Sequence, residues 1–265
     1  MLNLVGRKCL FRTTMNAIPI DFSLSNQAWL FSVPILLTLV GFSVFWFISK
    51  DSGIKRRFYE ESDTNMDNTN HIFFTKVVGF LSMGLIPLVI MLILFPNTDL
   101  AYYGFTIIPE TSMLSLLWIV LLSVAVIPLA YFSAKKPKNL LNYPQIRTRE
   151  WSKRTFYLNL FGWFIYLVGY EVLFRGTLLF PIYQLVGLWP AIAINVALYA
   201  ATHIPKGIEE TIGAVPLGIV LCILTLQTGT LWIAIFVHVA LAWTNSLTAL
   251  KFHPDIHYIS RKKDV

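Results

Sequence analysis

The chain has 265 residues, of which 56% are hydrophobic and 13% are charged, and its formal net charge is +7. A soluble domain carries roughly 25% charged residues. Here the apolar residues cluster in runs long enough to cross a bilayer, which takes about 20 residues each. The composition therefore excludes an ordinary soluble protein and indicates an integral membrane protein. The Lys and Arg residues lie in short segments between the apolar runs, so the positive charge indicates lipid headgroups and not nucleic acid.

Seven apolar runs follow one another along the chain. Because lipid cannot satisfy free backbone groups, we expect each run to be a helix, which gives an all-α polytopic transmembrane helical bundle of about seven spans. The expected spans are 28–48, 73–95, 113–132, 155–180, 188–204, 212–227 and 230–250. The chain then divides into an N-terminal segment 1–27, three spans with their loops in 28–154, four spans in 155–250, and a basic tail 251–265.

The Lys and Arg residues also predict the orientation of the bundle. Segment 49–72 holds four of them, segment 133–154 holds seven, and segment 96–112 between these two holds none. The positive-inside rule places basic loops in the cytoplasm, so we expect the N-terminus outside and the C-terminus inside. Arg7, Lys8 and Arg12 oppose this assignment, but the longer basic segments outweigh them.

Neither the cysteines nor the N-terminal residues indicate covalent cross-linking or processing of the chain. Cys9 and Cys222 are far apart in the chain, so we expect no disulfide framework. No continuous apolar stretch follows the first basic residues, so we expect no cleaved signal peptide, and Met15 is an alternative start.

Several polar positions have simple structural interpretations. Segment 51–70 is polar and charged and is predicted to be a flexible cytoplasmic loop. Lys76, near the inner end of the second run, is expected to extend toward the headgroups. His71, His253 and His257 fall outside the predicted spans and are expected to be solvated.

Four ionisable residues lie within the later spans: Glu171, Arg175, His203 and His238. Such residues are costly in a bilayer and are therefore candidates for function. Glu171 and Arg175 are four residues apart, so they share a helix face in the order that favours an ion pair. The structural alternative is a pair that only fixes helix packing, and a lone buried histidine can likewise have no chemical role.

Together the three proton-binding groups indicate hydrolytic chemistry. A carboxylate such as Glu171 can take a proton from water. Histidines such as His203 and His238 can orient that water or, once charged, stabilise a developing oxyanion. The same three side chains can alternatively hold a zinc ion with one open position. The sequence leaves both options open.

The pattern resembles the CPBP family of intramembrane proteases, also called the Abi family, which includes the endoprotease that trims prenylated CAAX proteins. The first family motif is two adjacent glutamates, three residues and an arginine, and here 170–176 reads YEVLFRG. The second motif, an aromatic residue, three residues and a histidine, matches Tyr199 to His203. The third, a late histidine, matches His238. The resemblance covers roughly 155–250.

Two positions depart from the family pattern. Tyr170 stands where the family has the first glutamate, which is usually assigned as the base that activates water. Ala242 stands where the family often has an asparagine that helps to stabilise the oxyanion. Asn245 lies on the same helix face as His238 and is a candidate replacement, while Glu171 is a candidate replacement for the base.

The resemblance implies a CAAX-type intramembrane endopeptidase in a bacterial inner membrane, acting on a peptide or membrane-protein substrate. Glu171, His203 and His238 are then the catalytic residues, supported by Arg175 and Tyr170. No cofactor is required in a glutamate mechanism, whereas zinc is required in a metal mechanism. The alternative, favoured by Tyr170 and Ala242, is a catalytically inactive relative that serves as a membrane scaffold or immunity protein.

Overall fold

The computed structural model describes residues 23, 25–60 and 66–259, and within them the expected all-α helical bundle is confirmed. The α-helices are α1 (Asn26–Lys50), α2 (Ser52–Glu60), α3 (Met66–Gly79), α4 (Ile86–Leu94), α5 (Pro109–Ala134), α6 (Pro137–Leu140), α7 (Lys153–Glu171), α8 (Phe180–Val186), α9 (Leu188–Ala201), α10 (Ile208–Thr228) and α11 (Trp232–Phe252). Two π-helical segments, Phe80–Leu85 and Val172–Leu179, join α3 to α4 and α7 to α8. Arg7, Lys8, Cys9, Arg12 and Met15 lie outside the described residues.

Six helices in the described part of the chain are long and apolar enough to cross a membrane. They are Asn26–Lys50, Asp67–Leu94, Pro109–Ala134, Lys153–Val186, Ile208–Thr228 and Trp232–Phe252. The predicted span 188–204 is the shorter helix α9, whose 14 residues extend about 21 Å. Gly187 and Gly207, which flank this helix and its terminal turn, have φ angles of 79° and 108°. These left-handed conformations suit glycine and limit the length of the helix.

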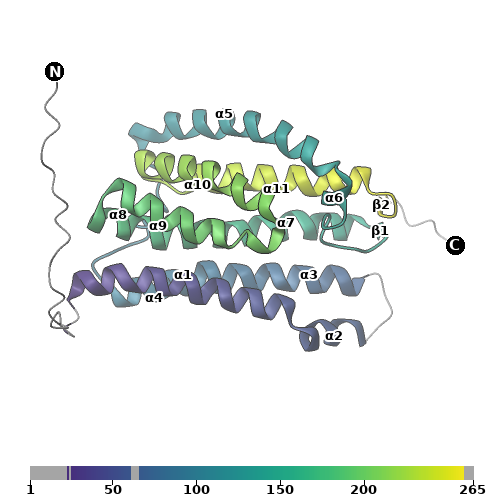
Figure 1. Ribbon diagram of the computed structural model, residues 1–265, viewed down its shortest axis with the longest axis horizontal. Coiled ribbons are helices and arrows are strands. Elements are labelled where there is room, and N and C mark those ends of the chain that lie inside the picture. The colour runs from purple at the N-terminus through teal and green to yellow at the C-terminus, as the bar shows by residue number, and fades with distance from the viewer. Residues whose placement is uncertain (1–22, 24, 61–65, 260–265) are drawn as a thin grey trace, which may run out of the picture.

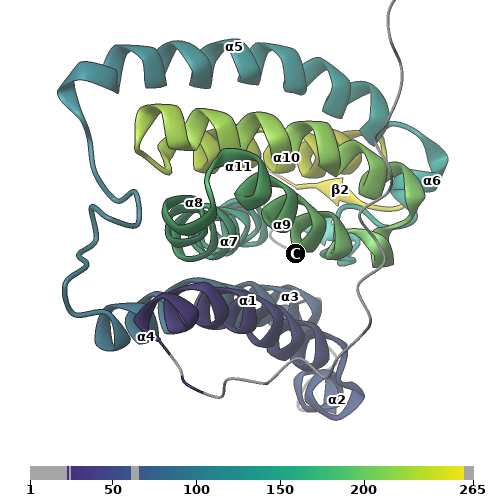
Figure 2. The same ribbon diagram turned by 60° about the vertical axis from the view of Figure 1, so that its left-hand side comes forward.

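The helices stack in layers (Figure 1). Helices α1, α3 and α4 form one outer layer, α7, α8 and α9 lie in the middle, and α10 and α11 lie beyond them with α5 outermost. Figure 2 shows the same order from another side. The largest cluster of buried apolar residues draws on the middle layer and on α11, so polar groups in the middle layer are shielded from the surroundings.

The first motif runs from the end of helix α7 into the π-helical segment Val172–Leu179, and close backbone packing fixes the position of α7. Ser152 caps its first turn by accepting a hydrogen bond from the Thr155 N–H at 3.3 Å. Farther along, Gly169 packs against Gly84, where an added Cβ atom would lie 2.5 Å from the Gly169 Cα. Small residues allow helices in membranes to approach this closely. The two residues after Gly169 are therefore held against the neighbouring π-helical segment.

The prediction of a flexible loop over 51–70 is wrong for residues 52–60, which form α2, and for residues 66–70, which begin α3. The Asp51 carboxylate accepts a hydrogen bond from the Ile54 N–H at 2.7 Å, which satisfies a free donor of the first turn. The Phe58 ring then lies 5.4 Å from the His71 ring. His71 is consequently 5% exposed, so its prediction as a solvated histidine is also wrong.

The segment after α5 and the segment after α11 meet at one end of the bundle. Strand β1 (Glu150–Trp151) pairs in parallel with β2 (His257–Tyr258). His257 is exposed, as predicted. His253 is half-buried and its Nε2 lies 3.1 Å from the Arg147 guanidinium. Burial and the neighbouring Arg147 charge both lower the pKa of His253.

Candidate active site

Glu171 is fully buried at the junction of α7 and the π-helical segment Val172–Leu179. Its Oε1 lies 2.6 Å from Nδ1 of His238 on α11, and its Oε2 lies 3.1 Å from Nη1 of Arg175. Arg175 is also fully buried, with its guanidinium 4.3 Å from the centre of the Tyr199 ring. The ion pair predicted from the spacing is present. Both oxygens of the carboxylate are engaged, one by a cation and one by an imidazole.

His203 follows α9 and is linked to His238 through the rings of Tyr170 and Tyr199, which both histidines contact. Its Nδ1 lies 3.0 Å from the Tyr199 carbonyl oxygen, and the two rings are 4.9 Å apart. When Nδ1 donates its proton to that carbonyl, Nε2 keeps its lone pair. The same holds for His238 when Nδ1 donates to ionised Glu171. Both histidines, each 9% exposed, can thus offer a basic Nε2.

Tyr170 lies near both histidines, with ring centres 6.4 Å from His203 and 5.6 Å from His238. Its hydroxyl lies 2.6 Å from the Thr202 hydroxyl, and Thr202 in turn donates to the Tyr199 carbonyl at 2.7 Å. Since the single Thr202 proton is used in that bond, Tyr170 is the donor to Thr202. Tyr170 therefore supplies no base at the position of the first glutamate.

A cavity of about 350 Å³ opens beside this group, between α1 and α3 on one side and α7 and the α9–α10 turn on the other. Tyr170, Thr202 and His203 line it, whereas Glu171 and His238 lie behind this lining. Tyr143 also lines it, and burial raises the pKa of the Tyr143 phenol. The cavity thus reaches the His203 side of the group.

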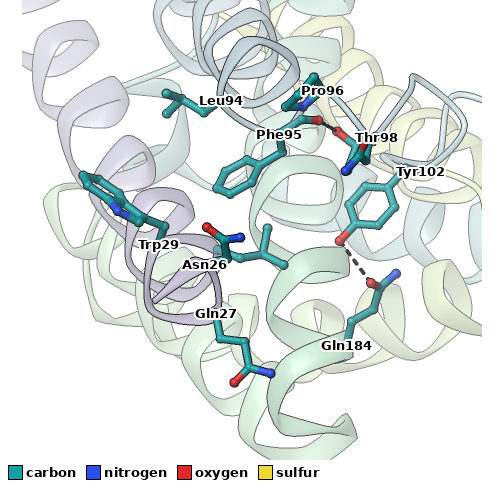
Figure 3. A pocket seen from close by; sticks show the side chains of 11 residues that line it. Asn26, Gln27, Trp29, Leu94, Phe95, Pro96, Thr98, Tyr102 and Gln184 are labelled. Carbon is teal, nitrogen blue, oxygen red and sulfur yellow. Dashed lines mark hydrogen bonds between the residues drawn. The ribbon is translucent and has the colours of Figure 1, made fainter. Parts of the chain in front are cut away.

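A second cavity, of about 680 Å³, lies at the opposite end of α1 (Figure 3). Its lining includes Asn26, Trp29, Phe95 and Gln184, and the Gln184 carbonyl accepts a 3.1 Å hydrogen bond from the Tyr102 hydroxyl. None of the candidate residues from the sequence lines it, so the smaller cavity is the candidate active site.

Lys76 is the clearest departure from the sequence-based expectations. It is 6% exposed, and its Nζ lies 3.1 Å from the centre of the Trp163 ring and 4.5 Å from that of Tyr166. The prediction that it extends to the headgroups is therefore wrong. The facing Gly162 explains this, because a Cβ there would lie 3.3 Å from the Lys76 Cγ. The absent side chain leaves a channel for the lysine stem.

Asn245 is not brought to the group. Its side-chain carbonyl accepts a hydrogen bond from the Asn139 amide at 3.1 Å, on the short helix α6. Seven residues separate it from His238 along α11, which is about 10.5 Å. The structure places Asn245 in a contact between helices.

Asn195 is a supporting residue that the sequence interpretation missed. It is fully buried on α9, donates to the Phe174 carbonyl at 2.5 Å and accepts from the Cys222 thiol at 3.2 Å. It thereby ties the π-helical segment to α9 and α10. An amide within the apolar run 188–204 was the available signal, because polar groups in such runs often bond across helices.

The zinc alternative does not fit the observed arrangement. In residues 23, 25–60 and 66–259, no three His, Cys, Asp or Glu side chains are grouped closely enough to hold a metal ion. Both Glu171 oxygens are engaged by His238 and Arg175, so the carboxylate has no oxygen free for a metal ion.

Residues 152–244 match the model of a family described as type II CAAX prenyl endopeptidase Rce1-like. This region is Rce1-like. The match covers about a third of the chain and includes YEVLFRG, Tyr199 to His203, and His238, so the resemblance to the CPBP family is confirmed. No curated protein and no solved structure matches the chain. The protein is an integral membrane protein, and the candidate active site lies in its Rce1-like region.

Proposed function

We propose that the protein is an intramembrane endopeptidase that hydrolyses peptide bonds of membrane-associated or lipid-linked peptides, using water activated by a Glu–His pair. The observation that carries this proposal is the 2.6 Å contact between Glu171 Oε1 and His238 Nδ1, next to a cavity lined by His203. The two partners are far apart in the chain and both are costly in a membrane. The match to CAAX endopeptidases supports the same chemistry.

The proposed reaction begins at His238. The Glu171 carboxylate accepts a hydrogen bond from Nδ1–H of His238. Nε2 of His238 is therefore free to take a proton from a water molecule as that water attacks the peptide carbonyl carbon. His238 then gives the proton to the leaving amine, and the carbon–nitrogen bond breaks. His203 binds the water through Nε2 or, when protonated, donates to the oxyanion.

Glu171 and Arg175 are positioning residues in this scheme. Because both oxygens of Glu171 are engaged and its side chain is fully buried, whereas the His238 side chain is 11% exposed, Glu171 acts through His238 and not directly on water. Arg175 neutralises the buried carboxylate, which lowers the cost of keeping it ionised. This differs from a mechanism in which Glu171 is itself the base.

One observation favours a second function, that of a catalytically inactive peptide-binding scaffold or immunity protein. Tyr170, at the position of the first glutamate, lines the cavity and donates its hydroxyl proton to Thr202. In this alternative, peptides enter the cavity and leave uncleaved. Binding without hydrolysis distinguishes the two functions.

The test is cleavage of a quenched fluorescent peptide library by the detergent-purified protein and by His238→Asn. Removing a general base should lower the rate about 10²- to 10⁴-fold. His257→Asn is the matched control, because His257 is exposed on β2, and it should keep the wild-type rate. A folded wild-type protein that binds peptides but cleaves none would instead support the scaffold.

We further propose that the protein lies in the inner (plasma) membrane of a bacterium with its C-terminus in the cytoplasm. The basic segment 133–154 and the basic tail support this orientation, and the described part of the tail meets that segment through β1 and β2.

A further inference from the structure

The cavity beside the candidate active site carries an excess of positive charge. Lys50, Lys76 and Lys206 line it, and Glu210 is the acidic residue among its described lining residues. Glu210 lies 3.8 Å from Lys206, so that pair is partly neutralised. Lys50 is exposed at the mouth, with its Nζ 5.0 Å from the Trp46 ring. Lys76 is thus the cation at the inner part of the cavity.

The buried ammonium group of Lys76 contacts aromatic rings and has no anionic partner among the described residues. Its charge lies over the Trp163 and Tyr166 rings, and within the described ranges no carboxylate is within ion-pair distance of it. Aromatic faces attract a cation but do not replace a counter-ion. His71, also buried in the cavity wall, has no hydrogen-bond partner for either ring nitrogen. Two buried polar groups therefore face a shared space.

We propose that Lys76 binds a carboxylate of the peptide substrate and is a specificity-determining residue of the proposed endopeptidase. This inference rests on the proposed function, because it assigns a substrate group to the same cavity. The carboxylate is either the free C-terminus of the peptide or an acidic side chain near the C-terminus. A charge-assisted hydrogen bond from the lysine ammonium to either oxygen recognises both.

The spacing along α7 sets the distance between this carboxylate and the bond to be cleaved. Lys76 lies over Trp163 and Tyr166, the Tyr166 ring stacks on Tyr170 at 6.1 Å, and Tyr170 contacts His203 and His238. From Trp163 to Tyr170 the helix rises about 10.5 Å. An extended peptide covers that length in about three residues, so a short peptide whose carboxylate meets Lys76 can also reach His203 and His238.

The position of Lys76 favours a peptide over a lipid phosphate as its partner. Lysines that bind lipid headgroups are exposed, to an extent that Lys138 shows in this structure with a side chain that is 68% exposed. Lys76 is instead enclosed in a cavity that continues to Tyr170, Thr202 and His203. A narrow chain end can reach it there, whereas a two-chain lipid would have to bring its headgroup between α3 and α7.

The test is fluorescence anisotropy of three labelled hexapeptides with the detergent-purified full chain. The peptides share an apolar sequence and end in a free carboxylate, in an amide, or in glutamate followed by an amide. We expect at least one carboxylate peptide to bind roughly 10- to 100-fold more tightly than the plain amide. Lys76→Met should remove this preference and leave amide binding unchanged. Lys50→Met is the matched control for a lysine at the mouth and should keep the preference.

The outcomes separate this inference from the proposed function. A carboxylate preference that depends on Lys76, without any cleavage, would support the anion site and overturn the endopeptidase. Cleavage with equal binding of acid and amide would overturn the anion site and leave the endopeptidase standing. Micelles containing phosphatidylglycerol provide the lipid arm. Competition by this lipid that Lys76→Met abolishes, with no peptide preference, would show a phosphate site instead and overturn the proposal. Loss of the preference in Lys50→Met alone would also overturn it.

Discussion

The Tyr170 hydroxyl donates a 2.6 Å hydrogen bond to the Thr202 hydroxyl, at the position where the CPBP motif has its first glutamate. This bond connects the first motif to the turn that carries His203. At the position to which the CPBP family assigns water activation, this chain has a side chain that links α7 to the end of α9. The proposed water activation consequently moves to the neighbouring residue, Glu171, acting through His238.

Tyr170→Phe should therefore affect stability more than catalysis. Removing one hydrogen bond of this kind costs about 1 kcal/mol of the free energy of unfolding. The peptidase rate should stay within about tenfold of wild type, because the variant removes only one of the hydrogen bonds that position the turn carrying His203. Denaturant unfolding in detergent and initial rates on a quenched peptide measure the two effects. A loss of a thousandfold or more would mean that the hydroxyl itself takes part in proton transfer.

Breaking the buried ion pair should be costly from either side. Arg175→Met leaves the Glu171 carboxylate in a fully buried site without its cation, and Glu171→Gln leaves Arg175 uncompensated. Each change should destabilise the protein by about 3–5 kcal/mol. The double variant should recover part of that loss, because the remaining groups are both neutral. A double-mutant cycle of unfolding free energies checks this, and strict additivity would contradict a coupled pair.

The close contact between Gly169 and the π-helical segment Phe80–Leu85 should tolerate no side chain. A Cβ at Gly169 would lie 2.7 Å from the Phe80 Cα, so Gly169→Ala must push two backbones apart. We expect a lower melting temperature and a lower peptidase rate, since the adjacent Glu171 shifts with the helix. Gly213→Ala on α10 is the control, because a Cβ there meets nothing within 4 Å. It should be neutral or stabilising by up to about 1 kcal/mol.

The orientation can be tested with single cysteines after Cys9 is replaced by serine. Cys222 can remain, because it is fully buried. A cysteine at Ile107, which is 74% exposed, should react with a membrane-impermeant maleimide in intact cells. A cysteine at Glu150, in the basic segment, should react only after the membrane is opened. The reverse labelling pattern would place the C-terminus outside and contradict the positive-inside assignment.

The sequence predicted those features that depend on local composition and spacing. Apolar run length predicted the six spans, although the seventh run, 188–204, is the shorter helix α9, and a spacing of four residues predicted the Glu171–Arg175 pair. Contacts between residues that are far apart in the chain could not be predicted from it. Lys76 was expected at the headgroups because its run alone does not reveal that Gly162, on another helix, leaves room for its stem. His71 was expected in solvent because α2, which covers it, has a composition typical of a loop.

Within the candidate site, the residue types were predictable but their partners were not. The three motifs identified Glu171, His203 and His238. Only the fold shows that Glu171 contacts His238, which lies 67 positions later in the chain. Asn245 was expected at the site from helix periodicity, but its side-chain carbonyl accepts a hydrogen bond from Asn139 on α6. Periodicity places a residue on a helix face and does not specify which neighbour that face meets.

The most direct test of the account is hydrolysis of the best library peptide in water enriched in oxygen-18, by wild type and by Glu171→Gln, with products read by mass spectrometry. Glu110→Gln, on the exposed first turn of α5, is the matched control. The account predicts one heavy oxygen in the new carboxyl terminus, and a rate at least about 100-fold lower in monodisperse Glu171→Gln but unchanged in Glu110→Gln. An uncleaved peptide in the wild-type reaction, or a Glu171→Gln rate equal to wild type, would contradict it.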